Sequence, residues 1–208
     1  MPNSDSVNPH DVSAPRVTVA HAEQLKQTGR YPGCRWSPSP NFGSRPQNSK
    51  ISLLVVHNIS LPPGQFGGPE IEQFFCNQLD PAGHPYFETI ASVQVSAHAL
   101  VRRDGSVIQF VSCLERAWHA GRSCFGAEEE CNDFSIGIEL EGTDDIPYTP
   151  EQYQTLASMV RLTMMAWPDV TPDRVAGHCD IAPGRKTDPG PAFDWPYFSA
   201  LLADQEIA

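Results

Sequence analysis

The sequence has no long apolar run. An unbroken stretch such as Leu53–Val56 is as long as its hydrophobic segments become, far short of the roughly 20 residues that a membrane-spanning helix needs. The first 15 residues contain neither the basic start nor the apolar segment of a secretion signal. We therefore expect the protein to stay in the cytosol.

Basic residues are scarce. The 208 residues include 14 Lys and Arg against 25 Asp and Glu, which gives a formal net charge of −11. Proteins that bind nucleic acid or anionic membranes draw their affinity from the opposite sign of charge. The composition therefore argues against nucleic acid and membrane surfaces as partners.

Paired cysteine motifs are also missing. Six cysteines are spread along the chain without a CxxC spacing, and a domain of this size, with 40% hydrophobic residues, forms a core without disulfides. We therefore expect reduced thiols. Proline is abundant instead, and 20 prolines predict many ordered loops and exclude long coiled coils.

The chain divides into a lead-in and one domain. Residues 1–25 are polar, contain three prolines and show little periodicity, so we expect a flexible N-terminal extension. Residues 26–208 are expected to form a single domain. A short helix is predicted at 20–28, and an irregular segment rich in Pro, Gly and Ser is predicted at 31–48.

Hydrophobic periodicity predicts strands and helices in mixed order. Strands are expected at 51–57, 93–102, 107–111, 135–141 and near 175, with Asp104-Gly105 in the turn of a hairpin. Helices are expected from Pro69 to Leu79, from a capping box at Thr149 to Trp167, and after Asp194. The apolar, β-branched strand at 51–57 is predicted to be central. The expected fold class is α/β (α+β), a central mixed β-sheet flanked by helices.

Three residues in this pattern suit a catalytic metal. His57 ends the buried strand, His178 follows a short predicted strand, and Asp188 comes ten residues later. Pro183 and Gly184 allow the chain between the last two to turn back. Two histidines and an aspartate are a permitted zinc set that leaves a fourth position for water. Taken alone, a histidine at a strand end such as His57 is also typical of a hydrogen-bonded structural residue.

A lysine lies close to the last of these residues in sequence. In an extended segment Lys186 points to the same side as Asp188, where it would stabilise an oxyanion that forms beside a metal. The alternative is a surface lysine paired with a carboxylate. Cys179 diverges from its neighbour His178 along an extended chain, so we interpret it as a packed small residue rather than a nucleophile.

The strand at 135–141 carries two carboxylates on one face. Glu139 and Glu141 alternate with apolar residues, so both point to the side opposite the apolar one. Either could act as the base that takes a proton from water activated by the metal. The spacing does not choose between them, and a solvated strand face is the alternative.

Five strings of the sequence carry a resemblance to a known family. They are LLVVHNISLPPGQFGGP from Leu53, SAHALVRRDG from Ser96, RAWHAG from Arg116, CNDFSIGIELEGTD from Cys131 and GHCDIAPGRKTDPGPAFDW from Gly177. Together they resemble the zinc N-acetylmuramoyl-L-alanine amidases of the AmpD type, within the peptidoglycan-recognition and phage-lysozyme-like amidase superfamily. The resemblance covers roughly residues 30 to 200.

The resemblance implies an amidase-like fold and assigns roles to residues. It implies one catalytic zinc ion with three ligands, His57, His178 and Asp188. It implies that Glu139 rather than Glu141 is catalytic, and that Lys186 supports the transition state. Substrate contacts are expected from the pocket residues Asn58, Trp118 and His119.

The implied reaction is hydrolysis of the lactyl amide bond between (1,6-anhydro-)N-acetylmuramic acid and L-alanine. The substrate would be a small-molecule muropeptide of cell-wall recycling, and the enzyme a monomer. A same-fold amidase acting on intact, exported peptidoglycan is one alternative, and a non-catalytic peptidoglycan-binding module is another. Residues 1–25 depart from the family pattern, as do Gln94 and Glu130, where relatives often have Arg, so substrate contacts do not transfer simply.

Overall fold

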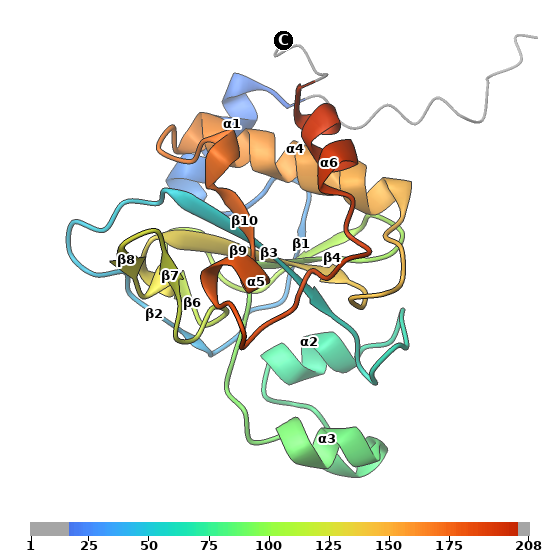
Figure 1. Cartoon of the computed structure of the whole chain (residues 1–208). Coiled ribbons are helices and arrows are strands. Elements are labelled where there is room, and N and C mark those ends of the chain that lie inside the picture. Colours follow the sequence, from blue (N-terminus) through green and yellow to red (C-terminus); the bar gives the residue numbers. More distant parts are fainter. Residues whose placement is uncertain (1–16, 204–208) are drawn as a thin grey trace, which may run out of the picture.

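The computed structural model describes residues 17–203, and residues 1–16 and 204–208 lie outside the described part. A six-stranded mixed sheet forms the centre of the molecule (Figure 1). Its strands, in spatial order, are β1 (Arg35–Trp36), β5 (Val107–Gln109), β4 (Ala99–Val101), β9 (Ser135–Glu141), β3 (Leu53–Ile59) and β10 (Val175–Gly177). The four strands β4, β9, β3 and β10 run parallel, and β5 pairs antiparallel with β4. The mixed sheet and the hairpin are confirmed.

Three helices cover one face of this sheet. They are α1 (Val19–Thr28), α4 (Pro150–Ala166) and α6 (Trp195–Ala203), and α1 and α6 both pack on α4 (Figure 1). The predicted capping box is present. The Thr149 hydroxyl accepts from the backbone amide of Gln152, and Oε1 of Gln152 accepts from the backbone amide of Thr149. Asp194 accepts from the Tyr197 amide and caps α6.

Shorter elements lie on the opposite side. They are α2 (Glu70–Phe75), α3 (Pro85–Ile90), α5 (His178–Ile181), two 3₁₀ turns (Pro81–Gly83, Cys131–Asp133) and two small sheets, β2 (Phe42–Gly43) with β6 (Arg116–Ala117) and β7 (Cys124–Phe125) with β8 (Glu128–Glu129). A third 3₁₀ turn (Pro172–Arg174) connects α4 to β10. Short elements joined by long loops leave backbone and side chains free to form a site on this side.

Strand alternation divides the core. In β3, Leu54 and Val56 pack toward the helices, whereas Leu53 and Val55 join a cluster on the other side of the sheet. His57 continues the second series. The predicted central strand at 51–57 is therefore confirmed, as a strand buried on both faces at its start and polar at its end.

Three predicted elements are shorter than the sequence pattern suggested, among them the strand predicted at 107–111, which is paired only over Val107–Gln109. The helix predicted from Pro69 to Leu79 ends at Phe75, because Asn77 adopts a left-handed conformation, with φ 58°, that breaks the helical path. Of the strand predicted at 93–102, only Ala99–Val101 is extended and paired. The error arose because apolar residues that pack in loops give the same local pattern as a strand.

The N-terminal prediction falls partly outside the described residues. Residues 1–16 are not described, and the boundary expected after residue 25 falls within α1, the helix predicted at 20–28. Ala22 and Leu25 of α1 are buried in the core. Among residues 17–203, no helix has the length and apolar content to cross a membrane.

Candidate metal centre and active site

The three residues predicted to bind a metal come together at the carboxyl ends of parallel strands. His57 lies near the end of β3, and His178 directly follows β10, whose Gly177 pairs with Val56 of β3. Asp188 reaches them from the loop after α5, where its carbonyl oxygen accepts from the Cys179 amide at 2.9 Å. Ligand sites form at this edge of α/β sheets because side chains there leave the strand without crossing the core.

The three potential ligand atoms form a small triangle. His57 Nδ1 is 2.9 Å from His178 Nδ1 and 3.1 Å from Asp188 Oδ2, and the third side, His178 Nδ1 to Asp188 Oδ2, is 3.0 Å. Both imidazoles are buried and the carboxylate is half-buried. In the described part of the chain, these residues have the proximity needed to hold a metal ion together.

The chemistry of the three donors fits a divalent cation. Burial lowers the pKa of His57 to about 4, so this imidazole is neutral at pH 7 and does not form an ion pair with Asp188. The Nε2 of His178 lies 3.1 Å from the carbonyl oxygen of Ala120, which only accepts, so its Nδ1 carries a lone pair. Three electron-rich atoms that face one another at about 3 Å are stabilised by a cation between them, and zinc takes this donor set.

Glu139 stands beside this triangle. It is the register partner of His57 on β9, it is only 9% exposed, and its Oε2 has no hydrogen-bond partner among residues 17–203. Burial raises the pKa of Glu139 well above its usual range, the charge of Asp188 raises it further, and Lys186 acts in the opposite direction. A buried carboxyl with an unsatisfied oxygen and a raised pKa is suited to accept and return a proton.

Glu141, two residues further along β9, has a different environment. Its Oε1 accepts from the Gly67 amide at 2.6 Å and its Oε2 accepts from the Arg103 amide at 3.2 Å, with Arg102 Nη1 3.7 Å away. The solvated strand face considered as an alternative is wrong, because both glutamates are buried. Glu141 ties two loops to the sheet, and Glu139 faces the site.

Lys186 lies on the exposed loop between His178 and Asp188 and lines the cavity over the triangle. Burial lowers the pKa of His57 and raises that of Glu139, and the charge of Lys186 adds to the first effect and opposes the second, so the ammonium group acts on both residues through space. Cys179 is half-buried, and burial raises the pKa of its thiol, so it remains a neutral thiol.

A cavity of about 550 Å³ opens over these groups. One wall is apolar and includes Tyr86, Ile90, Val93 and Trp118. The amide of Asn58 also lines it and donates to Asp144 Oδ1 at 2.8 Å. Sequence reasoning missed Asp144, because its link to Asn58 joins residues 86 positions apart.

The remaining predicted residues lie at different distances from the substrate space. His119 borders the cavity but is 9% exposed, and its Nδ1 is 2.9 Å from His57 Nε2, on the side of that ring away from Asp188. Glu130 is 3.5 Å from Arg116, and Gln94 is exposed; both are outside the set that lines the cavity.

Comparison with known proteins gives a consistent result. Residues 47–191 match the family model described as N-acetylmuramoyl-L-alanine amidase. The chain is 58% identical over 179 residues to the 1,6-anhydro-N-acetylmuramyl-L-alanine amidase AmpD of Salmonella typhimurium strain SL1344, covering 86% of this chain and 95% of the relative. A crystal structure of a selenomethionine AmpD derivative matches with a TM-score of 0.81 at 54% identity, covering 84% of this chain and 97% of that one.

A further solved structure contains a ligand. It is the amidase AmiD of Escherichia coli in complex with the substrate anhydro-N-acetylmuramic acid-L-Ala-D-γ-Glu-L-Lys, with a TM-score of 0.54 at 28% identity. The match covers 76% of this chain and 60% of that chain.

Proposed function

This chain belongs to the N-acetylmuramoyl-L-alanine amidase family, and from that premise we propose that it hydrolyses the lactyl amide bond between 1,6-anhydro-N-acetylmuramic acid and L-alanine in muropeptides released during peptidoglycan recycling. The observation that carries the proposal is the convergence of His57, His178 and Asp188 beside the buried Glu139. Support for the substrate comes from the names of the AmpD relatives and from the anhydro-muropeptide bound to AmiD.

The metal of this site is proposed to be a single zinc ion held by His57 Nδ1, His178 Nδ1 and Asp188 Oδ2. The donor set supports zinc, because two imidazoles and a carboxylate leave one tetrahedral position open. When bound, zinc supplies Lewis-acid activation of water and of the scissile carbonyl.

Glu139 is proposed to move the proton of the reaction. Its unsatisfied Oε2 accepts a proton from the attacking water, and the carboxylic acid so formed gives that proton to the amide nitrogen of L-alanine as it departs. The raised pKa supports both steps, because a carboxylate that is poorly solvated is a stronger base and still returns the proton.

Lys186 is proposed to stabilise the oxygen of the scissile carbonyl as negative charge develops on it. The ammonium group lines the cavity, and its charge is felt at both His57 and Glu139. A fixed cation beside a developing oxyanion lowers the barrier more than it strengthens ground-state binding, because the charge it meets is largest in the transition state.

Substrate contacts are proposed along the cavity wall. Asn58, oriented by Asp144, presents its amide to the sugar or peptide, and Trp118 offers an apolar surface. We place His119 behind His57 rather than among these contacts, because its Nδ1 is engaged with the ring of His57.

The compartment is proposed to be the cytosol. All six cysteines are free thiols, which is typical of proteins kept in a reducing compartment. Small recycled fragments of cell wall, rather than the intact polymer, are then the available substrate.

The test combines metal analysis with mass spectrometry of products from a 1,6-anhydro-N-acetylmuramyl peptide. We expect about one zinc ion per chain and release of a peptide that begins with L-alanine. Asp188→Ala is expected to lose zinc and turnover, whereas Asp173→Ala, a matched change at an exposed aspartate, keeps both.

Three outcomes would contradict this assignment. Full turnover of zinc-free protein would exclude the metal mechanism. Release of peptide from purified sacculi but not from the soluble substrate would instead indicate an amidase of intact peptidoglycan. Binding of muropeptide without any product would indicate a recognition module.

A further inference from the structure

Two consecutive residues, His119 and Ala120, each contact one histidine of the metal triangle at its Nε2 atom, on the side of the ring away from the triangle. His119 approaches the ring of His57, and the carbonyl of Ala120 approaches the ring of His178. We propose that this pair of residues, held by Asn132, sets the tautomer of both histidines, so that each presents an unprotonated Nδ1 to the metal. The inference rests on the proposed zinc function and assigns positioning residues to it.

The bond at His178 fixes its tautomer directly. Its Nε2 is 3.1 Å from the carbonyl oxygen of Ala120, which also accepts from Arg185 Nη2 at 2.6 Å. A carbonyl oxygen has no proton to give, so Nε2 carries a hydrogen, and in the neutral ring the lone pair therefore lies on Nδ1. That atom is the one that faces His57 and Asp188.

The tautomer of His57 follows from a chain of three hydrogen bonds. The hydroxyl of Ser135 donates to the carbonyl of Cys131 at 2.5 Å, so its oxygen accepts from His119 Nε2 at 3.1 Å. With its hydrogen on Nε2, neutral His119 accepts at Nδ1 from His57 Nε2, 2.9 Å away. The Nδ1 of His57 is then left with a lone pair, as in His178.

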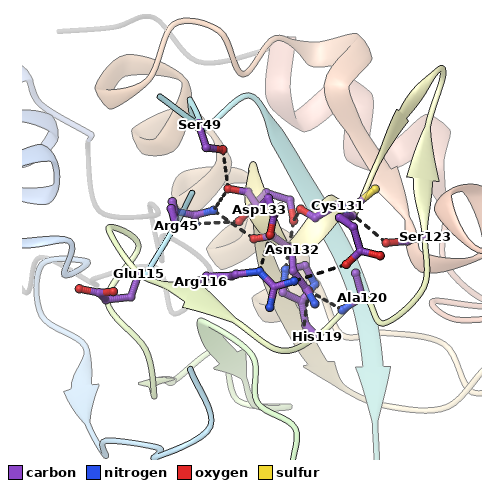
Figure 2. Close-up of polar contacts among 12 residues, drawn as sticks. Arg45, Ser49, Glu115, Arg116, His119, Ala120, Ser123, Cys131, Asn132 and Asp133 are labelled. Atoms are coloured by element: carbon purple, nitrogen blue, oxygen red, sulfur yellow. Dashed lines mark hydrogen bonds and ion pairs between the residues drawn. The ribbon is translucent and has the colours of Figure 1, made fainter. Parts of the chain in front are cut away.

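Asn132 fixes the position of this pair of residues. Its Oδ1 accepts from both backbone amides, His119 N at 3.1 Å and Ala120 N at 2.8 Å (Figure 2). Arg45 Nη1 stabilises the 3₁₀ turn that contains Asn132, because it donates to the carbonyl oxygens of Asn132 at 3.2 Å and Asp133 at 2.9 Å. The Asn132 side chain is buried, so water does not replace these bonds.

The sequence of β9 also makes room for the ring of His119. A Cβ atom at Gly137 would lie 2.4 Å from the His119 ring, which is impossible without displacing it. Gly137 is in β9, where a glycine weakens a strand, so its presence is explained by close approach of the ring rather than by the sheet. The strand therefore accommodates the same side chain that orients His57.

This arrangement orients the two imidazoles before a metal binds. An outer hydrogen bond fixes the direction and tautomer of a histidine ligand, and losing such a partner weakens metal affinity about 10- to 100-fold. His119→Leu removes the acceptor for His57, whereas His119→Asn places an oxygen near the position of Nδ1. Ser135→Ala removes only the outer acceptor and is a gentler variant if the leucine protein folds poorly.

The experiment measures zinc affinity by competition with a chromophoric chelator, and histidine tautomers by nitrogen-proton NMR of the metal-free protein. We expect the hydrogen on Nε2 of both His57 and His178 in the wild type. We expect zinc binding to weaken about 10- to 100-fold in His119→Leu and to recover most of that loss in His119→Asn. Ser135→Ala is expected to lie between them.

The outcomes separate this inference from the proposed function. A wild-type protein that binds no zinc would contradict the proposed function itself. Zinc binding of normal strength in both His119→Leu and Ser135→Ala, in a wild type that does bind zinc, would overturn only the positioning role. A hydrogen on Nδ1 of His57 in the metal-free wild type would also overturn it, whatever the turnover.

Discussion

The two faces of the central sheet differ sharply along β3 and β9. Toward the helices, the two strands contribute five fully buried apolar side chains to the core: Leu54, Val56, Ile136, Ile138 and Leu140. Toward the other side, the same strands present His57, Gly137, Glu139 and Glu141. One face of each strand therefore supplies stability, and the other carries the candidate chemistry.

The polar face keeps a group that costs stability. Glu139 has an unsatisfied oxygen in a buried position, which is unfavourable for folding, and the apolar face offsets this cost. A buried glutamate on this strand does not have to carry an unsatisfied oxygen. In Glu141, two positions later, both carboxylate oxygens accept from backbone amides. The difference supports the proposal that Glu139 is the residue retained for function.

The largest effect is expected at Glu139. Glu139→Gln keeps the shape but removes the base, so kcat should fall about 10²- to 10⁴-fold. Zinc content should be unchanged, and the metal-free protein should be at least as stable as the wild type, because a poorly solvated carboxyl is lost. Turnover by mass spectrometry and chemical unfolding measure the two quantities. A normal rate would transfer the catalytic role elsewhere.

A substitution that opens a cavity on the apolar face should have the opposite effect, a loss of stability without a loss of activity. Leu156 of α4 is fully buried in the cluster that covers β9. Leu156→Ala should lower the free energy of unfolding by about 2–5 kcal/mol while kcat per folded molecule and zinc content remain normal. Leu114→Ala, at an exposed leucine, is the matched control. A loss of zinc in the folded Leu156→Ala protein would show that the two faces are not independent.

The sequence predicted the metal triangle better than its surroundings. His57 lies near the end of a strand and His178 follows one, and strand ends are recognisable from local patterns, so their convergence could be predicted. The strand pattern could not choose between Glu139 and Glu141, because a period of two places both on one face, and only the family resemblance implied Glu139. Their difference depends on Gly67 and Arg103, which are distant in sequence. The positioning role proposed for His119 was hidden for the same reason, because it depends on contacts with His57 and Ser135.

A substitution at Glu141 tests whether this residue stabilises the fold rather than taking part in catalysis. Glu141→Leu leaves the amides of Gly67 and Arg103 without their acceptor, so the free energy of unfolding should fall by about 1–3 kcal/mol. The loop that ends at Gly67 contributes Leu61 and Pro63 to the cavity wall, so KM should rise more than kcat falls. Steady-state kinetics beside unfolding curves measure both. A kcat loss as large as that of Glu139→Gln would remove the distinction between the two glutamates.

The smallest effect is expected from a carboxylate on neither face. Glu72 of α2 forms a two-point pair with Arg35, at 2.7 and 2.5 Å, and Arg35 lowers the pKa of Glu72 to about 2. Because this pKa lies below the ordinary value of 4.5, the pair stabilises the fold above about pH 4.5, and the effect is lost as pH falls through about 2.

Both partners are partly exposed, so the contribution of this pair near neutral pH should be only about 0.5–1 kcal/mol. The stability gap between wild type and Glu72→Gln, measured by unfolding of metal-free protein, should therefore be constant above about pH 5 and narrow in acid, whereas Glu88→Gln shows no gap. A gap that widens in acid would have the wrong sign for a lowered pKa. Because a surface pair loses its effect only in acid and leaves kcat unchanged, it separates ordinary charge stabilisation from the buried roles of Glu139 and Glu141.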